Sequence, residues 1–123
     1  MPDVYLCMDG VPVWLELKIT KNDRVSVSKS QIAWHLAHSR CGGVSFFLVN
    51  DPSEDALFLF DGSLAAQLQD TKVSVLRPAA RWCGDMAAAP CALRLAAHES
   101  WSCALRPAPD GYGPGTNEER DRL

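Results

Sequence analysis

Long apolar runs are missing from this sequence. No stretch of about 18 consecutive apolar residues occurs, and a membrane-spanning helix needs a stretch of that length. The first residues carry an acid where a secretory signal would carry positive charge. We therefore expect a cytoplasmic protein that does not engage a membrane.

Regular cysteine spacing is also missing. The chain has five cysteines, and an odd number without regular spacing disfavours a disulfide framework. We expect all of them to be free thiols in the core: Cys7, Cys41, Cys83, Cys91 and Cys103. Cys83, Cys91, His98 and Cys103 are residue types found in zinc sites, but their spacing matches no compact zinc motif. We do not predict zinc.

An excess of positive charge, which is usual for a general nucleic-acid binder, is lacking because the formal net charge is −3. The charges are nevertheless unevenly distributed. Between residues 18 and 40 the single acid is Asp23, and the basic residues are Lys18, Lys21, Arg24, Lys29 and Arg40. Such a segment favours contacts to phosphates. A solvated basic loop is the alternative.

The length and composition allow one small domain. The chain has 123 residues, of which 47% are hydrophobic. We predict a folded core over residues 1–76, then a connector and a helix over residues 77–106. Pro90 suits the first turn of that helix, which would end at about Leu105. Its packing face, against the core or a second copy of the chain, would contain Leu93, Ala97, Trp101 and Ala104. Residues 107–123 are rich in proline, glycine and charge, and we expect them to be disordered.

The first nineteen residues predict a β-hairpin. Asp9-Gly10 is a strong signal for a two-residue turn between the strand-like runs 4–8 and 11–19. A turn there pairs Met8 with Val11 and sets Asp3 opposite Glu16, with Lys18 on the same face as Glu16. The other face is expected to be core, and it contains Val4, Leu6, Met8, Val11, Val13, Leu15, Leu17 and Ile19.

Two carboxylates on opposite positions of a ladder repel each other. A cation that offsets the repulsion between Asp3 and Glu16 would explain the pair, and a divalent metal ion is the natural candidate. An edge hairpin whose charges are simply solvated is the alternative. Tyr5 and Trp14 share this face and oppose each other, either shielding the site or packing under a helix.

The following residues predict an α/β fold with a mixed sheet. Ser28 and Gln31 have the spacing of a capping box, which indicates a helix over residues 29–41 that Gly42-Gly43 ends. The run 44–50 is apolar nearly throughout, as in a central strand. A strand over 56–60 and a short helix over 63–69 follow.

The pair Pro2-Asp3 followed by Glu16-Leu17-Lys18 resembles the signature of the PD-(D/E)xK nucleases. The next helix, with its leading glutamine, and the strand after Gly42-Gly43 make the order similar to small phage-type members of the Holliday junction resolvase-like and VRR-NUC-like branch. The resemblance covers residues 2 to about 62. It implies a restriction-endonuclease-like mixed sheet of order β-β-α-β-β-α, flanked by helices, as a nuclease core over residues 1–76.

The resemblance implies a metal-dependent endonuclease that cuts DNA. Carboxylates suit Mg²⁺ or Mn²⁺, so Asp3 and Glu16 would bind the ion, joined in this family by the main-chain carbonyl of the residue between acid and lysine, here Leu17. Lys18 would stabilise charge in the transition state. Related nucleases use a glutamine to orient a water or the phosphate, a role for Gln31 that competes with capping alone.

The substrate and partners are predicted less directly. We expect branched or junction DNA as the substrate, a homodimer as the acting form, and DNA contacts through Lys21, Arg24, Lys29 and Arg40. A nuclease fold that has lost catalysis and serves as an interaction module is the alternative function. His35 and His38 share a helix face with Gln31 and could approach DNA, although exposed helix histidines are common. Trp34 is expected in the core.

Overall fold

The computed structural model describes residues 2–104. The strands are β1 (Val4–Met8), β2 (Val11–Ile19), β3 (Val44–Asp51), β4 (Ala56–Asp61) and β5 (Trp82–Gly84). The α-helices are α1 (Lys29–Arg40), α2 (Ala65–Asp70), α3 (Val73–Leu76) and α4 (Ala89–Ala104), with 3-10 turns η1 (Gly62–Leu64) and η2 (Arg77–Ala79).

Within residues 2–104 the strands form one sheet of order β1-β2-β3-β4-β5. β2 and β3 are parallel and are joined through α1, whereas the other neighbours are antiparallel. The predicted α/β class with a mixed sheet is therefore confirmed. The prediction that the run 44–50 forms a central strand is also confirmed, because β3 lies in the middle of the sheet.

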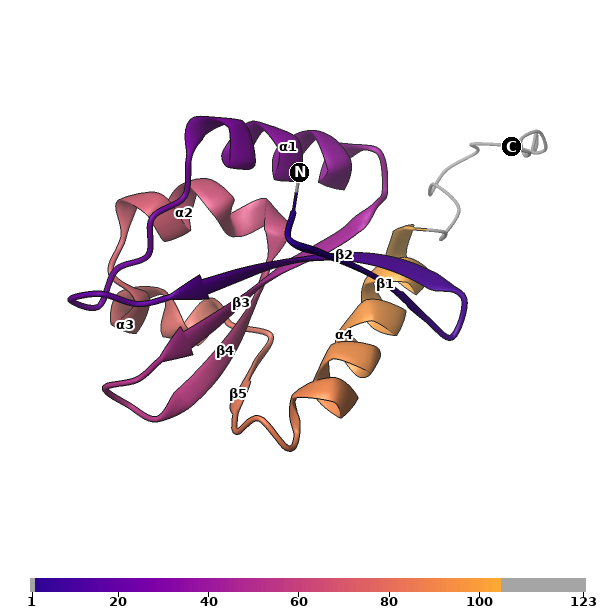
Figure 1. Ribbon diagram of the computed structural model, residues 1–123. Coiled ribbons are helices and arrows are strands. Elements are labelled where there is room, and N and C mark those ends of the chain that lie inside the picture. The colour runs from indigo at the N-terminus through magenta and orange to yellow at the C-terminus, as the bar shows by residue number, and fades with distance from the viewer. Residues whose placement is uncertain (1, 105–123) are drawn as a thin grey trace.

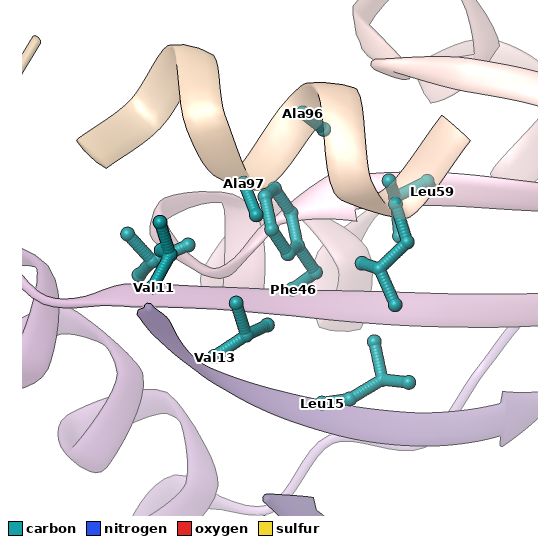
Figure 2. Close-up of a cluster of buried hydrophobic side chains, with 9 residues drawn as sticks. Val11, Val13, Leu15, Phe46, Leu59, Ala96 and Ala97 are labelled. Carbon is teal, nitrogen blue, oxygen red and sulfur yellow. The ribbon is translucent and has the colours of Figure 1, made fainter. Parts of the chain in front are cut away.

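Helices cover the two faces of the sheet and create two cores (Figure 1). One core lies between the sheet and α4, and Figure 2 shows Val11, Val13 and Phe46 beneath Ala97. The other lies under α1, α2 and α3 and contains Phe47, Phe58, Phe60 and Leu68. In the described part of the chain no helix is long and apolar enough to cross a membrane.

The hairpin has the predicted register. Met8 pairs with Val11, and Tyr5 pairs with Trp14. Asp9 and Gly10 have φ angles of 53° and 86°, the positive values that a tight I′-type turn requires at its two central positions. Asp3 therefore lies one step beyond the pair Val4–Leu15, which is the position opposite Glu16.

The predicted core face of the hairpin is wrong at one end. Leu17 is 49% exposed and Ile19 is 67% exposed, because the core under α4 takes in Val11, Val13 and Leu15 but not the last residues of β2. The free cysteines Cys7, Cys41, Cys83 and Cys91 were expected in the core, and they are exposed.

The region after residue 76 contains more structure than the sequence predicted. The connector includes β5, whose three residues pair with Leu57–Leu59 of β4. α4 begins at Ala89, one residue before the predicted start, and Leu93 and Ala97 are buried as predicted. The expected end at Leu105, the side chains of Cys103 and Ala104, and the tail 107–123 lie outside the described residues.

Candidate active site

Glu16 is a carboxylate buried beneath α1. The even-numbered residues of β2 from Trp14 to Lys18 point toward this helix, and Glu16 pairs with Phe47 of the parallel strand β3. Its side chain is only 2% exposed. The predicted polar face of the hairpin is thus correct in direction, but at Glu16 it is covered by a helix instead of being open to water.

Asp3 lies at the outer edge of β2, just ahead of β1. Its Oδ2 accepts a hydrogen bond of 2.9 Å from the backbone N–H of Leu17, so a carboxylate takes the place that a backbone carbonyl of β1 would fill. In an extended strand the N–H and C=O of one residue point to the same side. The carbonyl of Leu17 therefore points to the edge where Asp3 lies.

Gln31 connects three parts of the site. Its Oε1 accepts from Lys18 Nζ at 3.0 Å and from the backbone N–H of Ser28 at 3.0 Å, while its Nε2 donates to Glu16 Oε2 at 3.2 Å. Ser28 Oγ accepts in return from the backbone N–H of Gln31. The capping box is therefore present, and the same glutamine also joins the acid to the lysine.

His35 lies directly behind Glu16 and is fully buried. Its Nε2 is 3.3 Å from Glu16 Oε1, and its Nδ1 is 2.9 Å from Ser45 Oγ of β3. The predicted helix face is confirmed, since His35 follows Gln31 by one turn. The prediction that His35 could approach DNA is wrong, because no part of its ring reaches the surface. The i, i+4 spacing from Gln31 is the sequence signal that places His35 near the site. Nothing in the sequence indicates that Ser45 is its second partner.

The surroundings of Glu16 disfavour its ionised form. Burial raises the pKa of Glu16 above its usual value, and the nearby carboxylate of Asp3 raises this pKa further, while Lys18 opposes the shift. Burial, with smaller contributions from His38 and Lys18, lowers the pKa of His35 to about 4. The 3.3 Å contact of His35 with Glu16 is therefore a hydrogen bond of a neutral imidazole, not an ion pair.

Aromatic side chains border the site. The rings of Tyr5 and Trp14 are 4.7 Å apart, and Trp14 meets Trp34 of α1 edge-on at 5.8 Å. Trp14 thus packs under the helix, as one of the two alternatives predicted. His38 stacks on Trp34 at 4.6 Å, which places it in this aromatic row and not beside Glu16.

The donor set suits a hard divalent cation. Among residues 2–104 there is no group of three or more His, Cys, Asp or Glu side chains arranged to hold a metal ion. Mg²⁺ is usually bound by one or two carboxylates, with waters and substrate oxygens completing its shell. Asp3, Glu16 and the Leu17 carbonyl offer two carboxylates and one main-chain oxygen, and a cation would relieve the repulsion that raises the pKa of Glu16.

The predicted DNA-contacting residues are all exposed. Lys21 and Arg24 close the turn after β2 through two backbone hydrogen bonds, and Lys29 begins α1. Arg40 ends α1, about 17 Å along the helix axis from Lys29. Figure 1 shows the turn and the start of α1 at the same end of the molecule. Lys21 and Arg24 therefore share one turn, whereas Lys29 and Arg40 lie at the two ends of α1.

A pocket of about 560 Å³ lies apart from these groups, between the end of α1, the end of β4 and α4. Arg81 on its wall is bound by Asp61 at 2.8 Å and by Glu99 at 3.0 Å, so its charge is already compensated. Ser45 is the residue of the Glu16 site that lines this pocket. The acid pair, the lysine and the perturbed pKa values are at Glu16, which we take as the candidate active site.

Comparison with known proteins adds no relative: no protein-family model, curated protein or solved structure matches the chain.

Proposed function

We propose that this chain is a metal-dependent deoxyribonuclease of the PD-(D/E)xK type with a restriction-endonuclease-like core. The observation that carries the proposal is the buried Glu16, which receives a hydrogen bond from Gln31 while Gln31 also holds Lys18. With Asp3 ahead of β1, the two acids and the lysine of the signature, Asp3, Glu16 and Lys18, lie close together.

The burial of Glu16 supports a functional role over a structural one. A carboxylate that is 2% exposed and next to a second carboxylate is costly to keep ionised. A structural role would be served better by an apolar residue at this position of β2, because Glu16 lies beside the buried Phe47 of β3. Perturbed acids of this kind cluster at functional sites.

In the proposed site Asp3, Glu16 and the Leu17 carbonyl would hold Mg²⁺ or Mn²⁺. Such an ion, when bound, polarises the scissile phosphate and lowers the pKa of a water. Lys18 donates to Gln31, the amide that also donates to Glu16, and from there its ammonium would stabilise negative charge that develops on the phosphate oxygens. Gln31 keeps that ammonium close to Glu16 by accepting a hydrogen bond from it.

DNA would be held by the exposed side chains of Lys21 and Arg24 in the turn after β2 and of Lys29 and Arg40 at the two ends of α1. We propose branched or junction DNA as the substrate and a homodimer as the acting form, because two sites related by a twofold axis can address two strands of a branched duplex.

A cleavage assay tests the proposal. Purified protein with Mg²⁺ or Mn²⁺ is incubated with labelled junction, flap, linear duplex and single-stranded substrates. Glu16→Gln removes the proposed ligand with little change of volume, and Glu54→Gln alters an exposed carboxylate of the turn after β3 as a matched control. We expect the parent and Glu54→Gln to cut and Glu16→Gln not to cut.

Equal rates for Glu16→Gln and the parent would exclude this site. Binding of DNA without cleavage by the parent, under every metal condition, would instead favour the alternative of a nuclease-like interaction module that has lost catalysis.

A further inference from the structure

We propose that His35 is a positioning residue that fixes the carboxylate of Glu16 for metal binding, and that Ser45 holds the other ring nitrogen of His35. The inference rests on the proposed function, because it assumes that Glu16 is a metal ligand. It is carried by two contacts in the buried layer between α1 and β3, His35 Nε2 to Glu16 Oε1 at 3.3 Å and His35 Nδ1 to Ser45 Oγ at 2.9 Å.

The chemistry of a metal ligand gives these contacts a direction. A carboxylate that binds a cation is ionised and can only accept hydrogen bonds. A neutral imidazole has one donor nitrogen and one acceptor nitrogen, so His35 must donate from Nε2 to Glu16. Its Nδ1 is then the acceptor, and the hydroxyl of Ser45 must donate to it. The order of donation runs from Ser45 through His35 to Glu16.

The two oxygens of Glu16 are held by different donors on the same helix. His35 bonds Oε1, and Gln31, one turn earlier on α1, donates to Oε2 at 3.2 Å. One donor to each oxygen fixes the plane of the carboxylate, and each oxygen keeps a further lone pair for a cation. Hydrogen bonds from such surrounding groups orient metal ligands and tune their affinity in metalloproteins.

The surroundings of His35 restrict its ring. Phe47 packs against it with ring centroids 4.4 Å apart. The backbone of Gly62 lies so close that a methyl group there would overlap Ser45 Oγ and approach His35 Nδ1 to 2.9 Å. A side chain at position 62 would therefore displace the Ser45 hydroxyl from His35. The contact is therefore built into the fold at β3 and η1.

Two measurements test the inference on the intact protein. The first is ¹⁵N NMR of the imidazole nitrogens with Mg²⁺ present, which reports the tautomer of His35 without reference to cleavage. We expect the proton on Nε2. The second is calorimetric titration of Mn²⁺ into the parent, His35→Leu, His35→Gln and Ser45→Ala. His38→Leu serves as the matched control, since His38 lies on the same helix without contacting Glu16.

His35→Leu should weaken Mn²⁺ binding by about 10- to 100-fold. Ser45→Ala should weaken it less, and His35→Gln should recover most of the loss because its amide can still donate to Glu16. His38→Leu should bind like the parent. A merely structural histidine would lower thermal stability in His35→Leu and leave the affinity for Mn²⁺ unchanged.

The outcomes separate the two proposals. A parent that binds Mn²⁺ and cuts DNA while His35→Leu shows the same affinity would overturn the role of His35 alone. A proton on Nδ1 in the presence of Mg²⁺ would also overturn it. A parent that neither binds Mn²⁺ nor cuts DNA would overturn the metal site itself, and the role of His35 with it.

Discussion

The burial of Glu16 should make the free energy of unfolding decrease as pH rises. Its folded pKa lies above the unfolded value, so between the two values the folded protein binds more protons than the unfolded chain, and stability falls as pH rises. In Glu16→Gln this loss is absent. We expect the variant to be more stable than the parent at about pH 8 without metal, and the gain to vanish at about pH 4.

Urea unfolding at the two pH values measures the effect, and added Mg²⁺ reverses it. At about 100 times its Kd, a ligand stabilises the folded state by about 2.7 kcal/mol. The parent should gain this amount at about pH 8, and Glu16→Gln should gain nothing. The amide remains compatible with its neighbours because the His35–Ser45 pair can exchange donor and acceptor. Equal stabilisation of both proteins by Mg²⁺ would place the ion elsewhere.

Lys18 has a different task, and its loss should have a different signature. Its Nζ donates to Gln31 and not to a carboxylate, so Lys18→Met should leave affinity for Mn²⁺ nearly intact. Removing a preorganised group that stabilises transition-state charge costs about 3 to 4 kcal/mol, so turnover should slow by roughly 10² to 10³. Single-turnover cleavage and calorimetry measure the two quantities, with Lys72→Met, at an exposed lysine ahead of α3, as the control. If Mn²⁺ binding is lost, Lys18 supports the site structurally.

The first turn of α1 serves the helix and the site together, and two variants separate these roles. Ser28→Ala removes the capping hydroxyl, which accepts from the backbone of Gln31, and should cost about 1 kcal/mol of stability. Turnover below the unfolding transition should not change. Gln31→Ala removes the cap partner and also the donor to Glu16, so it should reduce metal affinity or turnover by about 10-fold or more.

Chemical unfolding and cleavage rates of the two variants give a direct comparison. The same turnover in Ser28→Ala and Gln31→Ala would mean that Gln31 acts only as a cap.

Sequence reasoning predicted elements well where one local rule decides them. The turn at Asp9-Gly10 fixes the register of β1 and β2 because both residues adopt positive φ. The capping box at Ser28 and Gln31 fixes the start of α1. β5 escaped prediction because three residues carry no periodic pattern. Its place is set by pairing with β4, a contact between segments more than twenty residues apart.

The candidate site was predictable in part for the same reason. Asp3, Glu16 and Lys18 follow from hairpin register, which is local. Burial of Glu16 does not, because it depends on how α1 lies across the sheet. The partner of His35 is Ser45 on β3, and a serine in an apolar strand carries no signal of its own. The exposure of Leu17 and Ile19 likewise depends on how far α4 extends over β2. This is a tertiary contact, and the alternation of residues along β2 does not predict it.

At the scale of the whole molecule the distribution of charge decides how DNA would bind. The net charge is −3, so long-range attraction to DNA is weak and affinity must come from a local cluster. The candidate basic cluster consists of Lys21 and Arg24 in the turn after β2 and Lys29 at the start of α1, and each is exposed. Ion pairs of basic residues with acids occur elsewhere, at Arg77, Arg81 and Arg94, where the positive charge is already compensated.

We therefore expect DNA affinity to depend on this cluster and not on residues 107–123. On duplex DNA the logarithm of the binding constant falls by about 0.9 per phosphate contact for each tenfold rise in salt. Neutralising Lys21, Arg24 and Lys29 together should reduce that slope by up to about 2.7 and weaken binding to all sequences alike. Deleting 107–123, which carries more acid than base, should leave the slope unchanged. Fluorescence anisotropy across a salt series measures both variants. Each phosphate contact that is removed lowers the number of counterions released on binding, and the salt dependence must then become weaker. If the triple variant binds like the parent while the deletion variant loses DNA binding, the cluster is therefore not the binding surface.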